Sequence, residues 1–246
     1  MINRDVIYNC WQIYSAGHKI YKSGETTVFR KLALINDRHD VLNFTVHKIN
    51  NNVMISAKNE SYIYFIFIGS DDPKDWISNF DFKFHNFDLA QNMKVHDGFY
   101  NSSLIFKDII ETESLPFKKV NITFIGHSRG GAMAFISAIT FAMNQNYKST
   151  TINVITYGQP RVGNHEYIRL LNTFSISYAR VIFEKDIICD VPPIALGYEH
   201  PWFGDRIILK TYWWHKIPLL FRKVHLDYER VINKDYIKKL FIRQDY

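Results

Sequence analysis

Cysteine is scarce in this sequence, and its two occurrences lie far apart. The 246 residues contain only Cys10 and Cys189, too few for a disulfide scaffold. No C-x-x-C pair or comparable spacing is present, so the sequence predicts no metal site. We expect both thiols to be free and buried, a state that fits a reducing compartment.

Long apolar runs are also missing. No stretch of 18 apolar residues occurs, and no transmembrane helix is therefore predicted. The segment that starts at Met1 lacks the continuous apolar region of a secretory signal. We therefore expect a cytoplasmic protein, with association at a membrane surface as the further option. No repeat, low-complexity tract or Pro/Gly/Ser-rich linker divides the chain, so residues 1–246 are predicted to form one domain.

Basic runs interleaved with aromatic residues, which are typical of nucleic-acid-binding proteins, do not occur either. No nucleic-acid partner is therefore predicted. The formal net charge of +6 fits a mildly basic solvated surface, and it equally fits contact with an anionic lipid surface. Hydrophobic residues make up 47% of the chain, enough to bury a sizeable core.

Short apolar runs rich in β-branched and aromatic residues alternate with helix-forming segments. Such runs are typical of strands that are buried on both faces. Residues 1–22 carry apolar positions at helical spacing and predict an amphipathic helix, and Ser128–Asn144 has a good helix composition. This alternation predicts an α/β fold with a mostly parallel central sheet flanked by helices. The predicted strands are Tyr62–Ile68, Val120–Ile125, Ile152–Tyr157, Tyr178–Phe183 and Ile207–Trp213, and Tyr236–Ile242 is predicted to be a C-terminal helix.

The most informative segment is Gly126–Ala132, which fits the pattern G-x-S-x-G around Ser128. A predicted strand runs into it and a predicted helix follows, which is the setting that a nucleophile elbow requires. Glycines at positions 126 and 130 remove side chains that would clash in a tight turn around an exposed serine hydroxyl. An ordinary glycine-rich turn, including one that binds phosphate, is the alternative, although neither the Walker lysine nor G-x-G-x-x-G is present.

Several motifs, in the same order, make the chain similar to the lipase class 3 family, which includes the fungal triacylglycerol lipases. The resemblance covers about residues 60–230 and implies an α/β-hydrolase fold. The most specific motif is Thr156–Asn164, a near-complete match to T-x-G-x-P-R-V-G-N. The other motifs are Ile68–Ser70 with Asp75–Trp76, Val95–Phe99, the elbow, and Asp186 followed by Val191–Pro193 and Gly197–His200.

The resemblance implies a Ser–Asp–His triad for ester hydrolysis. Ser128 is the predicted nucleophile and Asp186 the predicted acid, because Asp186 directly follows a predicted strand and aligns with the family's acid. Asp190, four residues later, is the rival. The oxyanion hole is predicted from the N–H groups of Ser70 and Arg129. This chemistry needs no cofactor.

The general base is predicted to be His225, in a segment that resembles the one around the family's late histidine. His200 and His215 are the alternatives among the ten histidines. His200 matches a G-Y-x-H pattern that is structural in the family, and His96 is expected to pack structurally. His127 lies beside the nucleophile and cannot turn back onto it.

Two departures from the family concern the oxyanion hole. The chain has Ile68 where the family often has arginine, and Arg129 where an aliphatic residue is usual. The Arg129 backbone N–H is nevertheless present, so the predicted hole is retained.

The implied substrate is a lipid carboxylic ester, with peripheral contact to a membrane or lipid-droplet surface as the further expectation. A phospholipase A1-type hydrolase, or an inert relative that binds lipid or protein, is the alternative function. The segment Asp71–Asp88 lies where the family carries its lid. Alternating phenylalanines at positions 80, 82 and 84 fit a strand packed on the core as well as they fit a lid.

Overall fold

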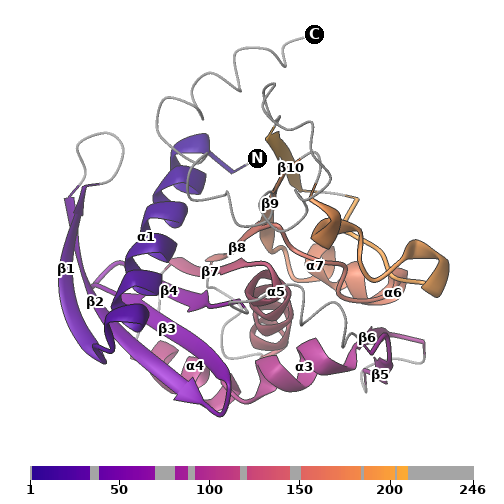
Figure 1. The fold of residues 1–246 in the computed structure, drawn as a ribbon, viewed down its shortest axis with the longest axis horizontal. Coiled ribbons are helices and arrows are strands. Elements are labelled where there is room, and N and C mark those ends of the chain that lie inside the picture. The colour runs from indigo at the N-terminus through magenta and orange to yellow at the C-terminus, as the bar shows by residue number, and fades with distance from the viewer. Residues whose placement is uncertain are drawn as a thin grey trace, which may run out of the picture.

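The fold is built around a single large sheet. The computed structural model describes residues 2–33, 39–69, 81–87, 92–116, 121–144, 151–183, 186–202 and 204–209. Eight strands lie in the order β1-β2-β3-β4-β7-β8-β9-β10 (Figure 1). Their bounds are β1 Thr27–Ala33, β2 His39–Ile49, β3 Asn52–Lys58, β4 Tyr62–Phe67, β7 Asn121–His127, β8 Thr151–Tyr157, β9 Ser177–Phe183 and β10 Asp205–Leu209.

The sheet changes character at β4. Strands β1 to β4 pair with one another in antiparallel fashion, whereas β4, β7, β8, β9 and β10 pair in parallel. Parallel neighbours need crossover connections, and α5 (Arg129–Ala142) provides the one between β7 and β8. The prediction of a mostly parallel sheet flanked by helices is confirmed.

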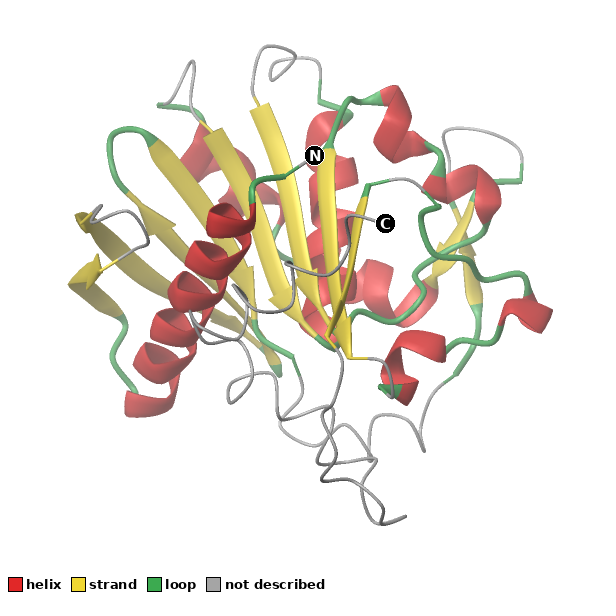
Figure 2. Cartoon of the chain, turned by 90° about the horizontal axis from the view of Figure 1, so that it is seen from above, coloured by secondary structure: helices red, strands yellow, loops and turns green. Residues whose placement is uncertain are grey.

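Helices cover both faces of the sheet (Figure 2). Helix α1 lies on one face, and α5 lies on the other with α3 and α4 beside it. The remaining bounds are α1 Arg4–Ser23, α3 Asp97–Leu104, α4 Lys107–Ser114, α6 His165–Ile168 and α7 Leu170–Thr173, with the 3₁₀ helices η3 Ile187–Asp190 and η4 Ile194–Leu196. A separate two-stranded ladder joins β5 Phe84–Asn86 to β6 Lys94–His96.

Helix α1 confirms the amphipathic helix predicted at residues 1–22. The Asn3 side chain accepts a hydrogen bond from the Asp5 N–H at the start, and Gly24, at φ 78°, ends the helix in the left-handed conformation. Its buried residues recur at helical spacing and pack on the sheet. They are Ile7, Cys10, Trp11, Ile13, Tyr14, Gly17 and Ile20.

Two cores lie on opposite faces of the sheet, because successive side chains of a strand point to opposite sides. In β7, Phe124 packs into the core beneath α5, and Ile125 packs into the core beneath α1. In β8, Val154 and Ile155 divide in the same way. Burial on both faces explains why these strands appear in the sequence as continuous apolar runs.

The other sequence predictions have mixed outcomes. The strands predicted around residues 62–68, 120–125, 152–157 and 178–183 are present as β4, β7, β8 and β9. Of Ile207–Trp213, residues 207–209 belong to β10, and the rest lies outside the described residues, as does Tyr236–Ile242. Strands β1 to β3 were not predicted: charged and exposed residues interrupt the apolar positions of β1 and β2, whereas β3 is buried from residue 53 to 57 and was missed.

The described residues also bear on the thiols and on membrane insertion. Neither Cys10 nor Cys189 is part of a disulfide, and both thiols are buried, as predicted. No helix within the described ranges is both long enough and apolar enough to span a bilayer.

Candidate active site

Ser128 lies at a sharp turn between β7 and α5. Its backbone has φ 57° and ψ −130°, and a positive φ is strained for a residue with a Cβ atom. The turn is held at both ends: the Ser128 N–H donates to the Tyr157 carbonyl (2.8 Å), and the Gly131 N–H donates to the Ser128 carbonyl (2.9 Å). Backbone strain that is maintained by its surroundings is typical of a functional position.

Glycines around Ser128 are required by close backbone approach. A Cβ atom on Gly126 would lie 2.1 Å from the Gly130 carbonyl oxygen, and one on Gly130 would lie 2.1 Å from the Phe67 carbonyl oxygen. Real Cβ atoms essentially never come within 3.0 Å of such a neighbour, so no side chain fits at either position. The predicted steric role of both glycines is confirmed.

The end of β4 also reaches the elbow. A Cβ atom on Gly69 would lie 2.7 Å from the His127 carbonyl oxygen and 3.3 Å from the Ser128 Cβ atom. The loop that begins at Gly69 therefore starts in contact with the nucleophile. Its next residue, Ser70, lies outside the described residues, so its predicted oxyanion role stays a prediction.

Arg129 is the first residue of α5, where backbone N–H groups are free of helical partners and the helix dipole is positive. Its N–H is therefore suited to an anionic oxygen beside Ser128. The half-buried guanidinium donates to the Asn52 amide oxygen and, at 2.7 Å, to the Ser102 hydroxyl. Burial lowers the pKa of Arg129. Sequence reasoning missed both anchors, because no local pattern links Arg129 to β3 or α3.

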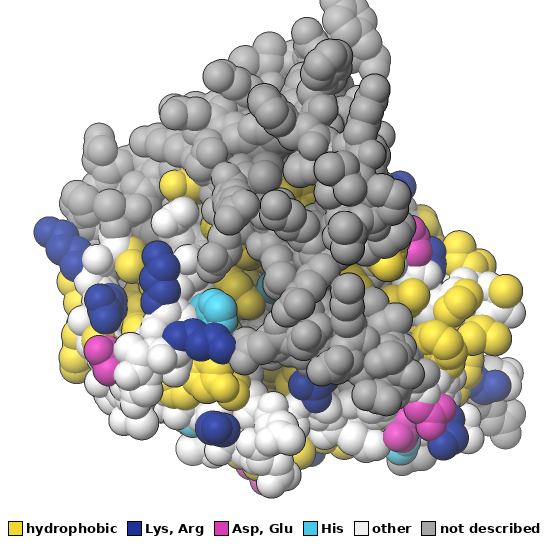
Figure 3. All heavy atoms as spheres, viewed as in Figure 1, with side chains coloured by type: hydrophobic (Ala, Val, Ile, Leu, Met, Phe, Trp, Pro, Cys, Tyr) yellow, Lys and Arg dark blue, Asp and Glu magenta, His cyan; other side chains and the backbone are white. Residues whose placement is uncertain are grey.

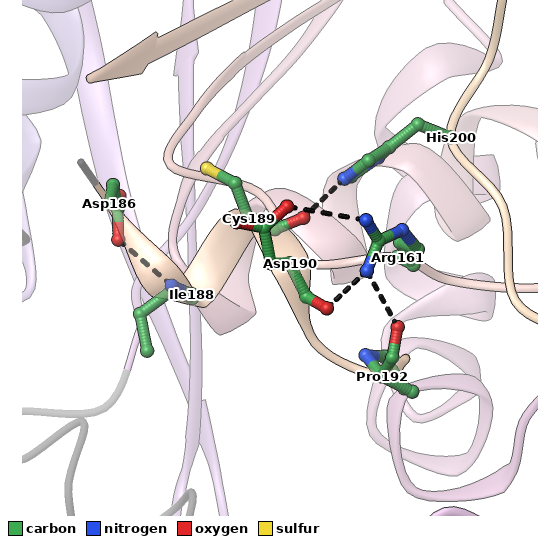
Figure 4. A network of polar contacts seen from close by, with 7 residues as sticks. All are labelled: Arg161, Asp186, Ile188, Cys189, Asp190, Pro192 and His200. Carbon is green, nitrogen blue, oxygen red and sulfur yellow. Dashed lines mark hydrogen bonds and ion pairs between the residues drawn. The ribbon is translucent and has the colours of Figure 1, made fainter. Parts of the chain in front are cut away.

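The two candidate acids lie in different environments. Asp186 follows the end of β9, is 4% exposed, and accepts a hydrogen bond from the Ile188 N–H (3.0 Å) at the start of η3. Asp190, at the other end of η3, pairs with Arg161 (3.2 Å) through a largely exposed side chain (Figure 4). Only Asp186 is both buried and placed directly after a central strand.

Ser128 and Asp186 follow the carboxyl ends of β7 and β9, which flank β8. Neighbouring strands lie about 4.8 Å apart, so about 10 Å separates the axes of these two strands. An imidazole with a hydrogen bond on each side is of the right length to bridge that gap. The strand order is therefore compatible with a histidine that bridges the two residues.

Three histidines of the described ranges have other partners. The His200 Nε2 atom donates to the Cys189 carbonyl (2.6 Å), and burial lowers the pKa of this ring well below its usual value (Figure 4). His96 accepts from the Phe99 N–H at the start of α3, as expected for a structural histidine. His127 makes edge contacts with Trp11 and Tyr14 on the α1 face. His225 and His215 lie outside the described residues.

A second serine–histidine–acid cluster lies on the antiparallel side of the sheet. The His47 Nε2 atom lies 3.2 Å from the Ser56 Oγ atom and 2.9 Å from a Glu113 carboxylate oxygen. A triad base contacts its nucleophile and its acid through different ring nitrogens, whereas both contacts here use Nε2. Ser56 is also fully buried. This cluster is therefore a structural polar network.

Exposed apolar side chains gather on the segment that carries η3 and η4, coloured orange in Figure 1. Figure 3 shows them as a hydrophobic patch over that part of the molecule. Phe84, one of the alternating phenylalanines, packs against Tyr198 (ring centroids 4.1 Å apart) in this region, and residues 70–80 and 88 lie outside the described ranges. The exposed apolar residues of this segment are Ile187, Ile194, Leu196 and Trp202, and Phe82, just before β5, is exposed as well. We name this set the apolar rim.

A central parallel sheet with a strained serine at a strand-to-helix turn defines an α/β-hydrolase. The model of the lipase (class 3) family matches residues 64–196, more than half of the chain, and the protein belongs to that family. It is 31% identical over 169 residues to a lipase of Rhizomucor miehei, with 64% of this chain and 46% of the relative covered. It is 32% identical over 136 residues to secreted mono- and diacylglycerol lipase 1 of Fusarium solani, covering 54% and 40%.

Other comparisons widen the range of relatives. Phospholipase A1-Igamma1 of Arabidopsis thaliana is 35% identical over 89 residues, covering 34% of this chain and 17% of the relative. The Rhizomucor miehei lipase–propeptide complex superposes with a TM-score of 0.64 at 22% identity, covering 84% of this chain and 66% of that one. This likeness concerns the fold. The chain spans less than half the length of the curated relatives that it matches.

Proposed function

We propose that this protein hydrolyses carboxylic esters of lipids through an acyl-enzyme on Ser128. The observation that carries the proposal is the strained elbow, because it holds a serine with positive φ at the N-terminus of α5. Membership in the lipase (class 3) family and the relatives named as lipases support the substrate class.

In this mechanism the Ser128 hydroxyl attacks the ester carbonyl while His225 accepts its proton. Asp186 holds the imidazole in the required tautomer and stabilises the imidazolium. Its burial at the carboxyl end of β9, two strands from the nucleophile, supports this role. His225 then returns the proton to the leaving alcohol, and water attacks the acyl-enzyme with the same histidine as base.

The oxyanion is held by the backbone N–H groups of Arg129 and Ser70. One such donor is typically worth about 3 kcal/mol at the barrier. The position of Arg129 at the first turn of α5 supports its part, and the contact of Gly69 with the elbow supports that of its neighbour.

The test is covalent labelling combined with turnover. A fluorophosphonate probe is expected to label the wild type once, at Ser128, and Ser128→Ala should lose both label and turnover of a short p-nitrophenyl ester. The matched control is Ser137→Ala, which removes another buried serine hydroxyl from α5. Turnover within tenfold of wild type in Ser128→Ala, with unchanged circular dichroism, would refute the assignment. An unlabelled, inactive wild type would favour the inert binding relative.

The choice of histidine is tested separately. Triad members act as a unit, so His225→Ala should fall nearly to the level of Ser128→Ala. His200→Ala should instead lower stability, because its ring bonds the Cys189 carbonyl in a buried position. If His200→Ala is folded and is the more damaging change to turnover, His200 is the base.

A phospholipase A1-type activity is the second candidate. The similarity to phospholipase A1-Igamma1 favours it, and the same triad would serve. Rates on triglyceride, monoglyceride and phosphatidylcholine, compared with the same purified protein, separate the two candidates.

Contact with a lipid surface and a location in the cytoplasm complete the proposal. The apolar rim supports surface contact, since Trp202 is 68% exposed and Ile194 is 64% exposed. The initial rate should therefore rise when a monoglyceride passes its solubility limit. A smooth saturating curve across that limit would assign a soluble-ester hydrolase. Fractionation of cells that express the protein tests its location.

A further inference from the structure

A cavity of about 510 Å³ is lined by residues of β9, β10 and the segment from Cys189 to Trp202. Neither Ser128 nor Asp186 is among the residues that line it. Its walls carry three arginines, Arg161, Arg180 and Arg206, together with His200 and Trp202. Its volume is within the range of pockets that hold small organic molecules.

Arg180 is the central cation of this cavity. It lies on β9 directly opposite Arg206 of β10 in the parallel register, so two like charges occupy neighbouring positions of the sheet. Arg180 is only 6% exposed, and its Nη1 atom is buried with no hydrogen-bond partner among the described residues. A buried guanidinium N–H group without an acceptor is costly, because it has lost its hydrogen bonds to water and has no protein acceptor in their place.

Arg161, which lines the same cavity, differs from Arg180 because its guanidinium has hydrogen-bond acceptors in the protein. It donates to the Asp190 and Pro192 carbonyl oxygens and to the Asp190 carboxylate (Figure 4). Its donors are therefore directed to the protein. Within the described residues, Arg180 and Arg206 make no ion pair of this kind.

The carboxylates that line the cavity are engaged elsewhere. Asp190 pairs with Arg161, Glu199 pairs with His165 (2.9 Å), and Asp205 accepts a hydrogen bond from the Ile2 N–H. Glu199 and Asp205 keep their negative charges in these contacts, so the lining carries three arginines and three carboxylates, and Arg180 is the buried cation with no carboxylate partner among the described residues. The arginines also act on His200: burial lowers the pKa of its ring, and the positive charges of the three arginines lower it further.

We propose that this cavity is a second binding site, which takes the phosphate or carboxylate group of a small organic anion on Arg180. A planar guanidinium matches both oxyanions through paired hydrogen bonds. Trp202 and Ile194 also line the cavity, and their side chains are exposed. They offer apolar contact to the remainder of the ligand. Neither Ser128 nor Asp186 lines the site, and the proposed binding does not depend on the proposed hydrolysis.

The test is calorimetric titration of the full chain with four probes: inorganic phosphate, octyl phosphate, octanoate and neutral octanol. We expect one equivalent of octyl phosphate or octanoate to bind the wild type, and the same in Ser128→Ala. Arg180→Gln should weaken that binding by about tenfold or more, the usual loss for a charged hydrogen-bond pair. The matched control is Arg169→Gln, an exposed arginine outside the cavity, which should bind as the wild type does.

The probes also identify the source of the anion. Binding of inorganic phosphate as well as octyl phosphate supports a site for a compact anion, whereas binding of the octyl compounds alone supports an amphiphilic ligand. Octanol binding as well as octanoate would overturn the proposal, as would the absence of anion binding to the wild type or equal binding to Arg180→Gln.

Stability provides a second readout. If Arg180 lacks a partner in the ligand-free protein, Arg180→Gln should melt no lower than the wild type in a buffer free of anions of this kind. Added octyl phosphate should then raise the melting temperature of the wild type only. A ligand-free Arg180→Gln protein that is strongly destabilised would identify Arg180 as a structural residue and overturn the proposal. Arg206→Gln, on the less buried arginine, gives an independent titration.

Discussion

The two halves of the sheet differ in strand direction and in how far their side chains are exposed. In the antiparallel half, β1 and β2 carry exposed apolar side chains such as Phe29 (71% exposed) and Val41 (54% exposed). In the parallel half, β7 and β9 are buried on nearly every residue. The antiparallel half tolerates solvent on one face, whereas the parallel half lies between layers of helices.

The strand direction explains why the candidate active-site residues lie in the parallel half. Parallel strands all end at the same edge, so the loops after β4, β7 and β9 bring Gly69, Ser128 and Asp186 to one side of the sheet. Hairpins return the chain to the opposite edge after each strand and cannot gather residues in this way. The antiparallel half does reach the site once, through the hydrogen bond from Arg129 to Asn52.

The largest expected effect is on the backbone of the parallel half. Gly126→Ala places a Cβ atom 2.1 Å from the Gly130 carbonyl oxygen, so we expect a loss of more than about 4 kcal/mol in the free energy of unfolding, or no folded protein. Gly24→Ala, next to the antiparallel half, meets nothing within 4 Å and should cost about 1–2 kcal/mol through its positive φ. Urea denaturation compares the two. Similar losses would contradict the close approach at the elbow.

The next effect is on pH dependence. Burial lowers the pKa of His96, the last residue of β6 and the N-cap of α3, to about 4. Below its ordinary value of 6.5 the unfolded chain binds a proton before the folded one does, so stability should fall as the pH drops from 6.5 to 4, by about 3 kcal/mol. His200 shifts in the same direction.

Urea denaturation at pH 7, 5.5 and 4.5 measures this loss. His96→Asn keeps a side-chain acceptor for the Phe99 N–H but removes the titrating ring, so its stability should depend less on pH. An identical pH dependence in wild type and variant would exclude His96 as the cause.

A smaller effect concerns the contact between the halves. Asn52→Ala removes one acceptor of the partly buried Arg129 guanidinium, and we expect kcat on a short soluble ester to fall about tenfold with little change in KM. The reason is that the Arg129 N–H is positioned for the transition state through its own side chain. Asn51→Ala, at an exposed neighbouring residue, is the control. Equal kcat values in the two variants would show that the hydrogen bond from Arg129 to Asn52 does not contribute to catalysis.

The smallest effect belongs to the exposed face of the antiparallel half. Phe29→Ser should change the free energy of unfolding by no more than about 0.5 kcal/mol and should leave esterase activity unchanged. Phe44→Ser, on a fully buried residue of β2, should cost about 3–5 kcal/mol. A large loss from Phe29→Ser would show that a further layer covers this face.

The sequence predicted the parallel half much better than the antiparallel half. Strands buried on both faces give continuous apolar runs, and β4, β7, β8 and β9 follow from them directly. Strand β2 spans His39–Ile49 and mixes charged, amide and apolar residues, so its pairing with β1 and β3 has no comparable local signal. Side-chain exposure on one face removes the pattern on which the prediction depends.

The sequence by itself determined the features that depend on neighbours along the chain. The order strand, G-x-S-x-G and helix places Ser128 at an elbow, because glycine is the only residue that permits the required backbone approach. Asp186 follows a buried strand and therefore lies at the same edge. His225 and Ser70 stay predictions, since both lie outside the described residues.

The tertiary structure alone decided which distant residues meet. Arg129 donates a hydrogen bond to Asn52, which is 77 positions away in the chain. Arg180 lies opposite Arg206 only because β9 and β10 pair in that register. A shift of one residue would turn these side chains to the other face of the sheet. Such contacts are set by strand order and register, which arise from packing of the whole core. The anion cavity therefore could not be predicted from any local pattern.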